Sequence, residues 1–83
     1  MDSHRLDGWV LYVREGCHLC EQFLLELSLD LGPAVEALRI ADVDQDAELA
    51  TRFGLRVPVL ESAGTVLCEG VYDAARVRAA LQV

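Results

Sequence analysis

The chain has 83 residues, so we expect a single domain over residues 1–83, and a hydrophobic fraction of 53% is ample for its core. Fourteen acidic residues stand against seven arginines and no lysine, and the net charge of −7 argues against a nucleic-acid partner, because phosphate contacts need a basic face. No apolar run approaches the ~20 residues that cross a bilayer, so no membrane partner is expected.

Cysteine usage and the opening residues indicate the compartment. The three cysteines leave one over even if two of them pair, and residues 1–7 are polar, without the apolar segment of a secretory signal. An odd cysteine count without such a signal argues against a secreted disulfide scaffold. We therefore expect a cytoplasmic monomer whose residues 1–7 form a frayed lead-in.

The first two predicted elements are a strand and a long helix. Residues 8–13 are rich in aromatic and β-branched side chains and almost continuously apolar, which is typical of a strand covered on both faces. Residues 18–31 have a helical repeat, and because Leu25 and Leu29 widen its apolar stripe, we expect a well-buried helix that ends at Gly32-Pro33. The stripe itself consists of Cys20, Phe23, Leu24, Leu27 and Leu31.

A second strand and a short helix should follow. Residues 37–43 have the pattern of a second strand. Asp44 or Asp46 could cap a short helix that runs to about Phe53. Gly54 suits the position just beyond the end of that helix.

The last third of the chain predicts a hairpin and a final helix. Residues 57–61 and 65–69 read as two strands joined by a short turn. Gly70 ends the hairpin, and Asp73 is a good cap for a helix over residues 74–81.

The predicted order β-α-β-α-β-β-α defines an α/β fold. The first two strands are joined by a helical crossover and should be parallel, whereas the last two should be antiparallel. A four-stranded mixed sheet with helices on both faces is the simplest arrangement of these elements.

Cys17 and Cys20 lie between the first strand and the first helix and are the candidate catalytic residues. A cysteine in the first turn of a helix faces free backbone N–H groups and the positive end of the helix dipole, which favour a nucleophilic thiolate at Cys17. Cys20 falls on the apolar stripe and would be the buried, resolving thiol. The alternatives are a redox-inert pair or half of a metal site. No second Cys-x-x-Cys or trailing His-x₃-His accompanies the pair, so we expect no metal.

Three motifs carry a family resemblance: Cys17-His18-Leu19-Cys20, Arg56-Val57-Pro58 and Glu69-Gly70-Val71-Tyr72-Asp73. With them, residues 8–82 resemble the thioredoxin fold in its minimal, glutaredoxin-like form, and the Cys-His-Leu-Cys version is similar to small bacterial glutaredoxin-like proteins. The resemblance implies that Pro58 is a cis proline that begins the third strand beside the cysteines. It also implies that the backbone of Val57 is open to a substrate and that the turn around Tyr72 lies near a glutathione site.

The chain departs from the family pattern at three positions. Arg56 stands where glutaredoxins that use glutathione usually carry threonine, and Glu69 stands where they usually carry glycine. Gly16 stands where thioredoxins carry tryptophan. Substrate and reductant therefore stay open.

Four more residues are candidates for modulating the thiols or binding the substrate. His18 either stabilises the Cys17 thiolate electrostatically or is an exposed residue without a role. Arg14 and Arg56 either attract an anionic thiol such as glutathione or are solvated surface residues. Tyr72 either contacts the substrate or packs in the fold.

Other conspicuous side chains have structural interpretations. Cys68 should behave as a small buried hydrophobic residue, and Trp9 and Tyr12 should lie in the core or on a sheet face. Asp42 and Asp44 should serve as turn and capping residues.

The sequence as a whole favours a thiol–disulfide oxidoreductase or electron carrier that acts by dithiol exchange. Its substrate would be a protein disulfide or a glutathione mixed disulfide, with glutathione as a conceivable co-substrate, an unidentified reductant and no separate cofactor. The alternative is a thioredoxin-fold binding module whose cysteines are idle or hold zinc or an iron–sulfur cluster.

Overall fold

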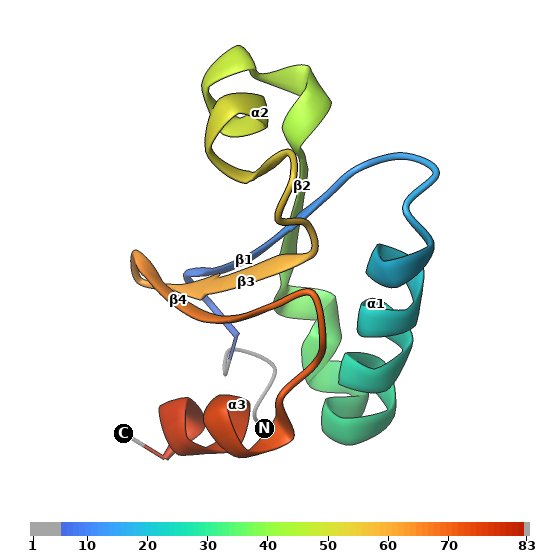
Figure 1. Cartoon of the computed structure of the whole chain (residues 1–83). Helices are drawn as coiled ribbons and strands as arrows, with labels where there is room; N and C mark the ends of the chain where they lie inside the picture. The colour runs from blue at the N-terminus through green and yellow to red at the C-terminus, as the bar shows by residue number, and fades with distance from the viewer. Residues whose placement is uncertain (1–5, 83) are drawn as a thin grey trace.

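The computed structural model describes residues 6–82 and has the predicted order of elements (Figure 1). The strands are β1 (Trp9–Val13), β2 (Arg39–Asp42), β3 (Val59–Ser62) and β4 (Thr65–Glu69). The α-helices are α1 (His18–Leu31), α2 (Ala47–Phe53) and α3 (Ala74–Leu81), and two 3₁₀ helices, η1 (Gly32–Ala37) and η2 (Val43–Gln45), flank β2.

The sheet is four-stranded and mixed, in the spatial order β2-β1-β3-β4. β1 and β2 are parallel, while β3 is antiparallel to both β1 and β4. Leu11 of β1 stands opposite Ile40 of β2 and Leu60 of β3, so these three side chains share one face of the sheet. The predicted α/β, thioredoxin-like architecture is confirmed.

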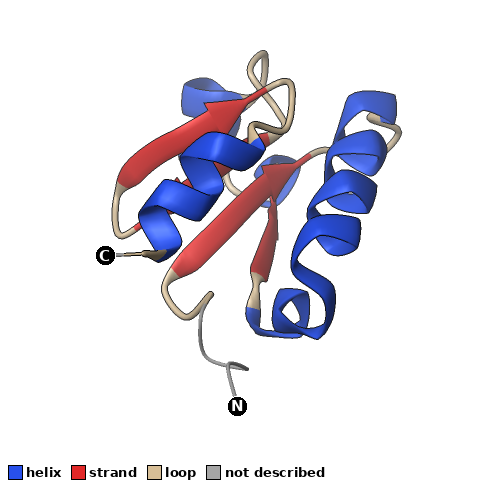
Figure 2. Cartoon of the chain, turned by 90° about the horizontal axis from the view of Figure 1, so that it is seen from below, coloured by secondary structure: helices blue, strands red, loops and turns tan. Residues whose placement is uncertain are grey.

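Helices cover both faces of the sheet, as expected. α3 lies below the sheet in Figure 1 and crosses in front of the strands in Figure 2, and α1 stands at the right in both views. α2 lies at the top of Figure 1, on the other side of the sheet from α3. The larger core fills the α1 and α3 side; its buried members are Leu6, Trp9, Leu11, Phe23, Leu27, Leu38, Leu60, Cys68 and Val77. The smaller core, under α2, consists of Tyr12, Val43, Phe53 and Val59. Trp9 and Tyr12 thus point to opposite faces of one strand.

The start of the described chain is more ordered than the sequence suggested. Leu6 belongs to the segment that we expected to fray, yet its side chain is fully buried in the larger core. The backbone N–H of Trp9 donates to the Leu6 carbonyl, which turns the chain into β1. The rest of the predicted lead-in, residues 1–5, lies outside the described residues.

The width of the buried stripe on α1 was predicted wrongly. Leu25 and Leu29 are 53% and 78% exposed, whereas Phe23 and Leu27 are buried. One side of a helix that covers a sheet faces solvent, so the extra leucines extend the apolar stripe beyond the contact with the sheet. Gly32 ends the α-helix as predicted with a left-handed φ of 64°, but η1 follows it and delays the second strand to Arg39.

The connection from α2 to β3 also differs in detail from the expectation. The strand begins at Val59, after Val57 and a cis peptide bond to Pro58. Gly54 caps α2, but with an ordinary right-handed φ of −54° rather than the left-handed conformation that commonly selects glycine there. Its small size matters instead, because a Cβ atom would overlap the Ala50 carbonyl oxygen and press on the Arg14 guanidinium.

Candidate active site

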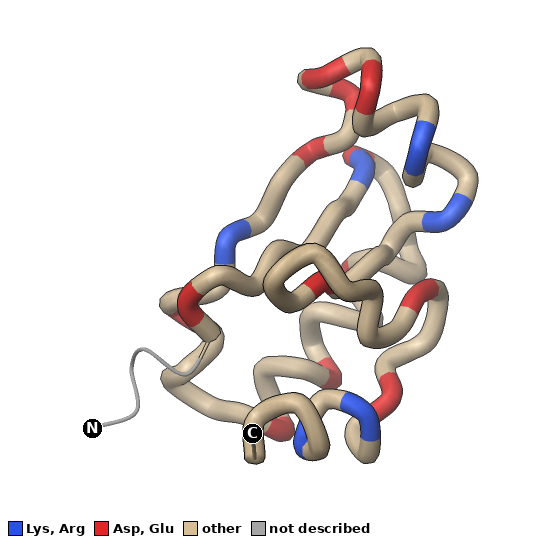
Figure 3. The backbone as a smooth tube through the Cα atoms, turned by 90° about the vertical axis from the view of Figure 1, so that its left-hand side faces the viewer, with Lys and Arg blue, Asp and Glu red and all other residues tan. Residues whose placement is uncertain are grey.

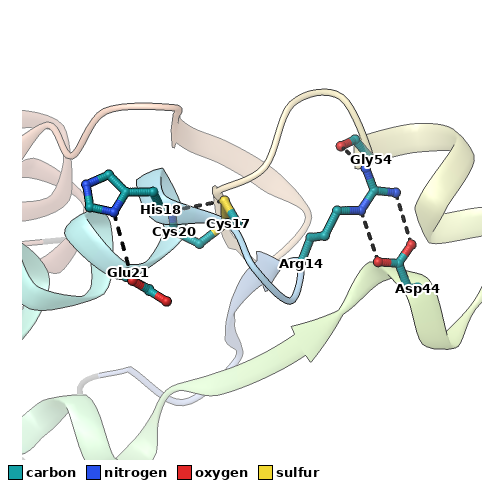
Figure 4. The surroundings of a disulfide bond; sticks show 7 residues. All are labelled: Arg14, Cys17, His18, Cys20, Glu21, Asp44 and Gly54. Carbon is teal, nitrogen blue, oxygen red and sulfur yellow. Dashed lines mark hydrogen bonds and ion pairs between the residues drawn. A yellow bond between two sulfur atoms is a disulfide. The ribbon is translucent and has the colours of Figure 1, made fainter.

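Cys17 and Cys20 form a disulfide at the junction between β1 and α1 (Figure 4). The chain leaves β1 at Val13 and turns through Gly16, whose φ of 76° lies in the left-handed region that favours glycine. Cys17 is the N-cap of α1, and its Cα atom lies 5.2 Å from that of Cys20. The turn therefore places both sulfur atoms in the first turn of the helix.

The two cysteines differ in exposure in the direction expected from the sequence. Cys17 is half-buried, whereas Cys20 is only 5% exposed and lies on the inner side of α1. The Cys17 Sγ accepts a hydrogen bond of 3.1 Å from the backbone N–H of Cys20, as a side-chain N-cap does. A reacting group from outside the protein therefore reaches Cys17 more easily than Cys20.

His18 lies on the solvent side of the motif. Its side chain is 91% exposed, and Nδ1 lies 4.0 Å from Oε1 of Glu21. The imidazole and Arg14 project to opposite sides of the cysteine pair in Figure 4. Any positive charge on His18 is therefore partly balanced by a neighbouring carboxylate.

Arg14 is held in a structural contact rather than directed at the disulfide. Its Nε and Nη2 each donate to Asp44 at 3.0 Å, and Nη1 donates to the Gly54 carbonyl at 3.0 Å (Figure 4). This pairing raises the pKa of Arg14 and lowers that of Asp44. These hydrogen bonds link the loop that carries Cys17 to the residues just before and just after α2.

The aspartates at the end of β2 and just after it divide the expected turn and capping roles. Asp42 accepts a hydrogen bond of 2.9 Å from the backbone N–H of Asp44, and Asp46 accepts one of 2.9 Å from that of Glu48 at the start of α2. Of the two candidates, Asp46 is thus the cap of the short helix. Asp44 serves the ion pair with Arg14 instead.

Pro58 and Val57 occupy the end of the sheet from which the Cys17 loop departs. Val59, next to Pro58, stands opposite Tyr12 near the end of β1, and the Pro58 carbonyl accepts from the Gly70 N–H at 2.8 Å. The N–H of Val57 donates to the Phe53 carbonyl at 3.0 Å. This donor is therefore engaged within the chain, although the resemblance implied a Val57 backbone open to a substrate.

The two charged departures from the glutaredoxin pattern bind each other. Arg56 donates from Nε and Nη2 to the two carboxylate oxygens of Glu69, at 3.2 and 2.6 Å. The pairing lowers the pKa of Glu69, and the guanidinium also lies over the Phe53 ring. Their opposite charges thus cancel locally, and the Arg56 charge is not left free for an anionic substrate.

Tyr72 is placed at the far end of α1. Its hydroxyl donates to Asp30 at 2.7 Å, its ring meets Phe23 edge-on at 5.5 Å between centroids, and Arg78 binds the same carboxylate. Burial, together with the hydrogen bond to Asp30, raises the pKa of Tyr72. Asp30 lies 13 positions beyond Cys17, about 20 Å along the helix, so the structure does not bring the Tyr72 hydroxyl to the disulfide.

Cys68 is a free cysteine in the larger core, as expected of a small buried hydrophobic residue. Burial raises the pKa of its thiol and so disfavours the reactive thiolate. It is therefore set apart from the Cys17–Cys20 pair both by position and by chemistry.

A cavity of about 270 Å³ opens beside the disulfide, and the sequence did not predict it. Both cysteines line it, together with Val13, Glu15, Glu21, Leu24 and Ile40 among others. Glu21 and Leu24 could have been found from their spacing of four residues from Cys17 and Cys20. Ile40 is brought in only by the register of β2 against β1.

The described residues hold neither a cluster of metal ligands nor a membrane-spanning helix. Among residues 6–82, no group of three or more His, Cys, Asp or Glu side chains is arranged to hold a metal ion. Within the same residues, no helix is both long enough and apolar enough to span a bilayer.

Residues 9–82 match the family model described as Glutaredoxin-like domain (DUF836). The chain belongs to this glutaredoxin-like family. A comparison with curated proteins found no match.

Two solved structures of bacterial proteins are similar to this glutaredoxin-like chain over most of its length. The X-ray structure of protein XcR50 from X. campestris is 37% identical, with a TM-score of 0.71, and the match covers 89% of this chain and 95% of the other. The solution NMR structure of protein Ne2328 from Nitrosomonas europaea is 29% identical, with a TM-score of 0.71 and 88% of each chain covered. The family resemblance drawn from the cysteine motif is thereby confirmed.

The ion pairs of this glutaredoxin-like fold predict how its stability depends on pH. The pKa values of Asp30, Asp44 and Glu69 are lowered, chiefly by hydrogen bonds from arginines. A carboxyl group with a lower pKa in the folded state stabilises the fold above its unfolded pKa and loses that contribution as the pH falls through its folded value. We therefore expect the free energy of unfolding, measured in urea, to fall as the pH drops below about 4.5.

A pair of variants checks this origin of the acid sensitivity. Asp44→Asn should make the free energy of unfolding fall less steeply as the pH drops. Glu36→Gln replaces an exposed carboxylate outside these ion pairs and should leave the slope as in the wild type. A wild-type protein equally stable at neutral pH and at about pH 3 would contradict the prediction.

Proposed function

We propose that this protein is a thiol–disulfide oxidoreductase that exchanges electrons through Cys17 and Cys20. The observation that carries the proposal is the geometry of the pair. Cys17 is accessible at the N-cap of α1 and accepts a hydrogen bond from the backbone. Cys20 lies on the buried side of α1 and forms the disulfide with Cys17. The membership in a glutaredoxin-like family supports it.

The proposed reaction has two exchange steps. The Cys17 thiolate attacks one sulfur of the partner's disulfide, so a Cys17–partner disulfide forms and the partner's second sulfur leaves as a thiolate that takes up a proton. The Cys20 thiolate then attacks Cys17 Sγ, forms the Cys17–Cys20 disulfide and releases the first partner sulfur, which is protonated in turn. The protein's dithiol loses two electrons and two protons, and the partner's disulfide gains them. An external dithiol or a pair of thiols would reverse both steps.

The first turn of α1 supports the role of Cys17 as the attacking thiol. In the reduced protein, the Cys20 N–H and the positive end of the helix dipole would stabilise a Cys17 thiolate. His18, when protonated, would add a weaker and solvent-screened attraction because Glu21 shares its charge. Cys20 needs no such activation, since its target is brought to it by the first step.

A binding module with a zinc ion or an iron–sulfur cluster has less support. Such a centre takes four ligands in general, and the cysteine pair supplies two. Within residues 6–82 the third cysteine, Cys68, is buried in the larger core. No three His, Cys, Asp or Glu side chains of these residues are grouped so that they could hold a metal ion. Dithiol exchange needs only the two cysteines of the disulfide, whereas a metal or cluster centre would need further ligands.

Site-resolved alkylation of the reduced, folded protein tests the proposal. The rate at which Cys17 reacts with iodoacetamide should rise with pH, because only the thiolate reacts. The midpoint of that rise should lie well below the pKa of ~8.5 of an ordinary cysteine. Cys68 is the internal control and should stay unlabelled until the protein is unfolded, because it is buried and its pKa is raised. A Cys17 midpoint near the ordinary value, with no Cys17–Cys20 disulfide formed under mild oxidation, would refute the proposal.

A further inference from the structure

We propose that the partner's cysteine is presented on a protein segment that carries an apolar side chain and neighbouring basic residues, and that small anionic thiols such as glutathione are poor partners. The inference rests on the proposed function, since it concerns the substrate class of the same disulfide. It is drawn from the cavity beside that disulfide and from the charges around it.

The cavity offers an apolar surface in direct contact with the reactive pair. Val13 ends β1, Leu24 lies one helical turn beyond Cys20, and Ile40 stands on the α1 side of the edge strand β2. Ile40 is 50% exposed, because β2 has no further strand on its outer side. A volume of about 270 Å³ suits one or two side chains of a partner rather than a large ligand.

The charged groups around this cavity are predominantly negative. Glu15 and Glu21 line it on either side of Cys17 in the sequence, and the Glu15 carboxylate has no ion-pair partner among residues 6–82. Within the described part of the chain, the one ion-pair contact of Glu21 is that with the exposed His18, at 4.0 Å. Arg14 also lines the cavity, and its guanidinium is bound to Asp44 and the Gly54 carbonyl.

The second arginine expected to attract an anionic thiol is neutralised as well. Both carboxylate oxygens of Glu69 bind the Arg56 guanidinium. Figure 3 shows arginines and acidic residues interspersed along the backbone, and the whole chain has a net charge of −7. Local and long-range fields therefore both favour the approach of a cationic segment and oppose an anionic thiol.

Two matched peptides test this substrate class. Each is a capped tetrapeptide with one cysteine beside one leucine, flanked by arginines in the first and by glutamates in the second, and each is activated as a 2-pyridyl disulfide. The Cys17 thiolate of the reduced protein attacks the peptide sulfur, the Cys17–peptide disulfide forms, the peptide–pyridyl S–S bond breaks and 2-thiopyridone leaves with the proton. The activated disulfide is the oxidant, and the absorbance of 2-thiopyridone gives the rate.

The arginine peptide should react roughly tenfold faster than the glutamate peptide at low ionic strength, and the ratio should fall as salt is added. Glu15→Gln and Glu21→Gln should each reduce the ratio about two- to fivefold, the size expected of one exposed charge. Glu36→Gln is the matched control, because it removes the same charge from η1, outside the cavity. Exchanging the peptide's leucine for glycine should slow the arginine peptide.

The possible failures separate the two proposals. If both peptides react fast and equally, or if Glu36→Gln changes the ratio as much as Glu15→Gln and Glu21→Gln, the substrate class is overturned while dithiol exchange stands. If neither peptide reacts faster with the protein than with the amide of N-acetylcysteine at the same pH, the proposed function itself fails.

Discussion

Cys17→Ser is expected to lower the rate of disulfide exchange to background, on the order of 10³-fold or more, whereas Cys20→Ser should keep the first step and accumulate a mixed disulfide. The hydroxyl of serine is far less acidic than a thiol, and the remaining thiol of the first turn, Cys20, is only 5% exposed, so we expect neither group to replace the Cys17 thiolate. In the proposed reaction Cys20 acts only on Cys17 Sγ, to which it is bonded in the disulfide form. Its loss therefore removes the step that releases the partner.

The two products are distinguished by mass and by kinetics. Incubation of each variant with a disulfide substrate, followed by non-reducing mass spectrometry, should find the partner's mass added to Cys20→Ser and absent from Cys17→Ser. Cys68→Ala is the matched control and should exchange at the wild-type rate, because Cys68 lies in the core away from the disulfide. A mixed disulfide on Cys20 in the Cys17→Ser variant would reverse the assigned roles.

Phe23→Ala is expected to have the largest effect on stability, a loss of about 3–5 kcal/mol in the free energy of unfolding. Phe23 is 1% exposed on the inner side of α1, and its ring meets Tyr72 edge-on. Truncation removes buried apolar surface, leaves a cavity and loses the aromatic contact. A domain of this length has on the order of 4–12 kcal/mol in total, so the variant should lose a large part of its free energy of unfolding.

Leu29→Ala on the same helix provides the comparison. Leu29 is 78% exposed, so the same kind of truncation should change the free energy of unfolding by less than ~0.5 kcal/mol. Both values can be measured by urea denaturation followed by far-ultraviolet circular dichroism. Equal losses for the two variants would mean that Leu29 is buried in solution, by a partner or by a second copy of the chain.

The order of elements and the placement of the two cysteines could be predicted from the sequence because they depend on local chemistry. A helical repeat, a cysteine at the first turn, a glycine at a left-handed turn and an aspartate before a helix act within a few residues of each other. Thus the N-cap position of Cys17, the inward direction of Cys20 and the end of α1 at Gly32 all agree with the expectation. Leu25 and Leu29 are the exception, since periodicity says which side of a helix is apolar but not how much of it a sheet covers.

Only the tertiary structure decided which charges are available at the site. Arg14 meets Asp44 across 30 positions of sequence, Arg56 meets Glu69 across 13, and Tyr72 meets Asp30 across 42. Long side chains can reach several partners, and the choice depends on which segments the sheet brings side by side. The apolar cavity likewise exists because the register of β2 sets Ile40 near the disulfide. Local pattern therefore determined where the two thiols lie on α1, whereas long-range packing determined the electrostatic and apolar surface that a partner would meet.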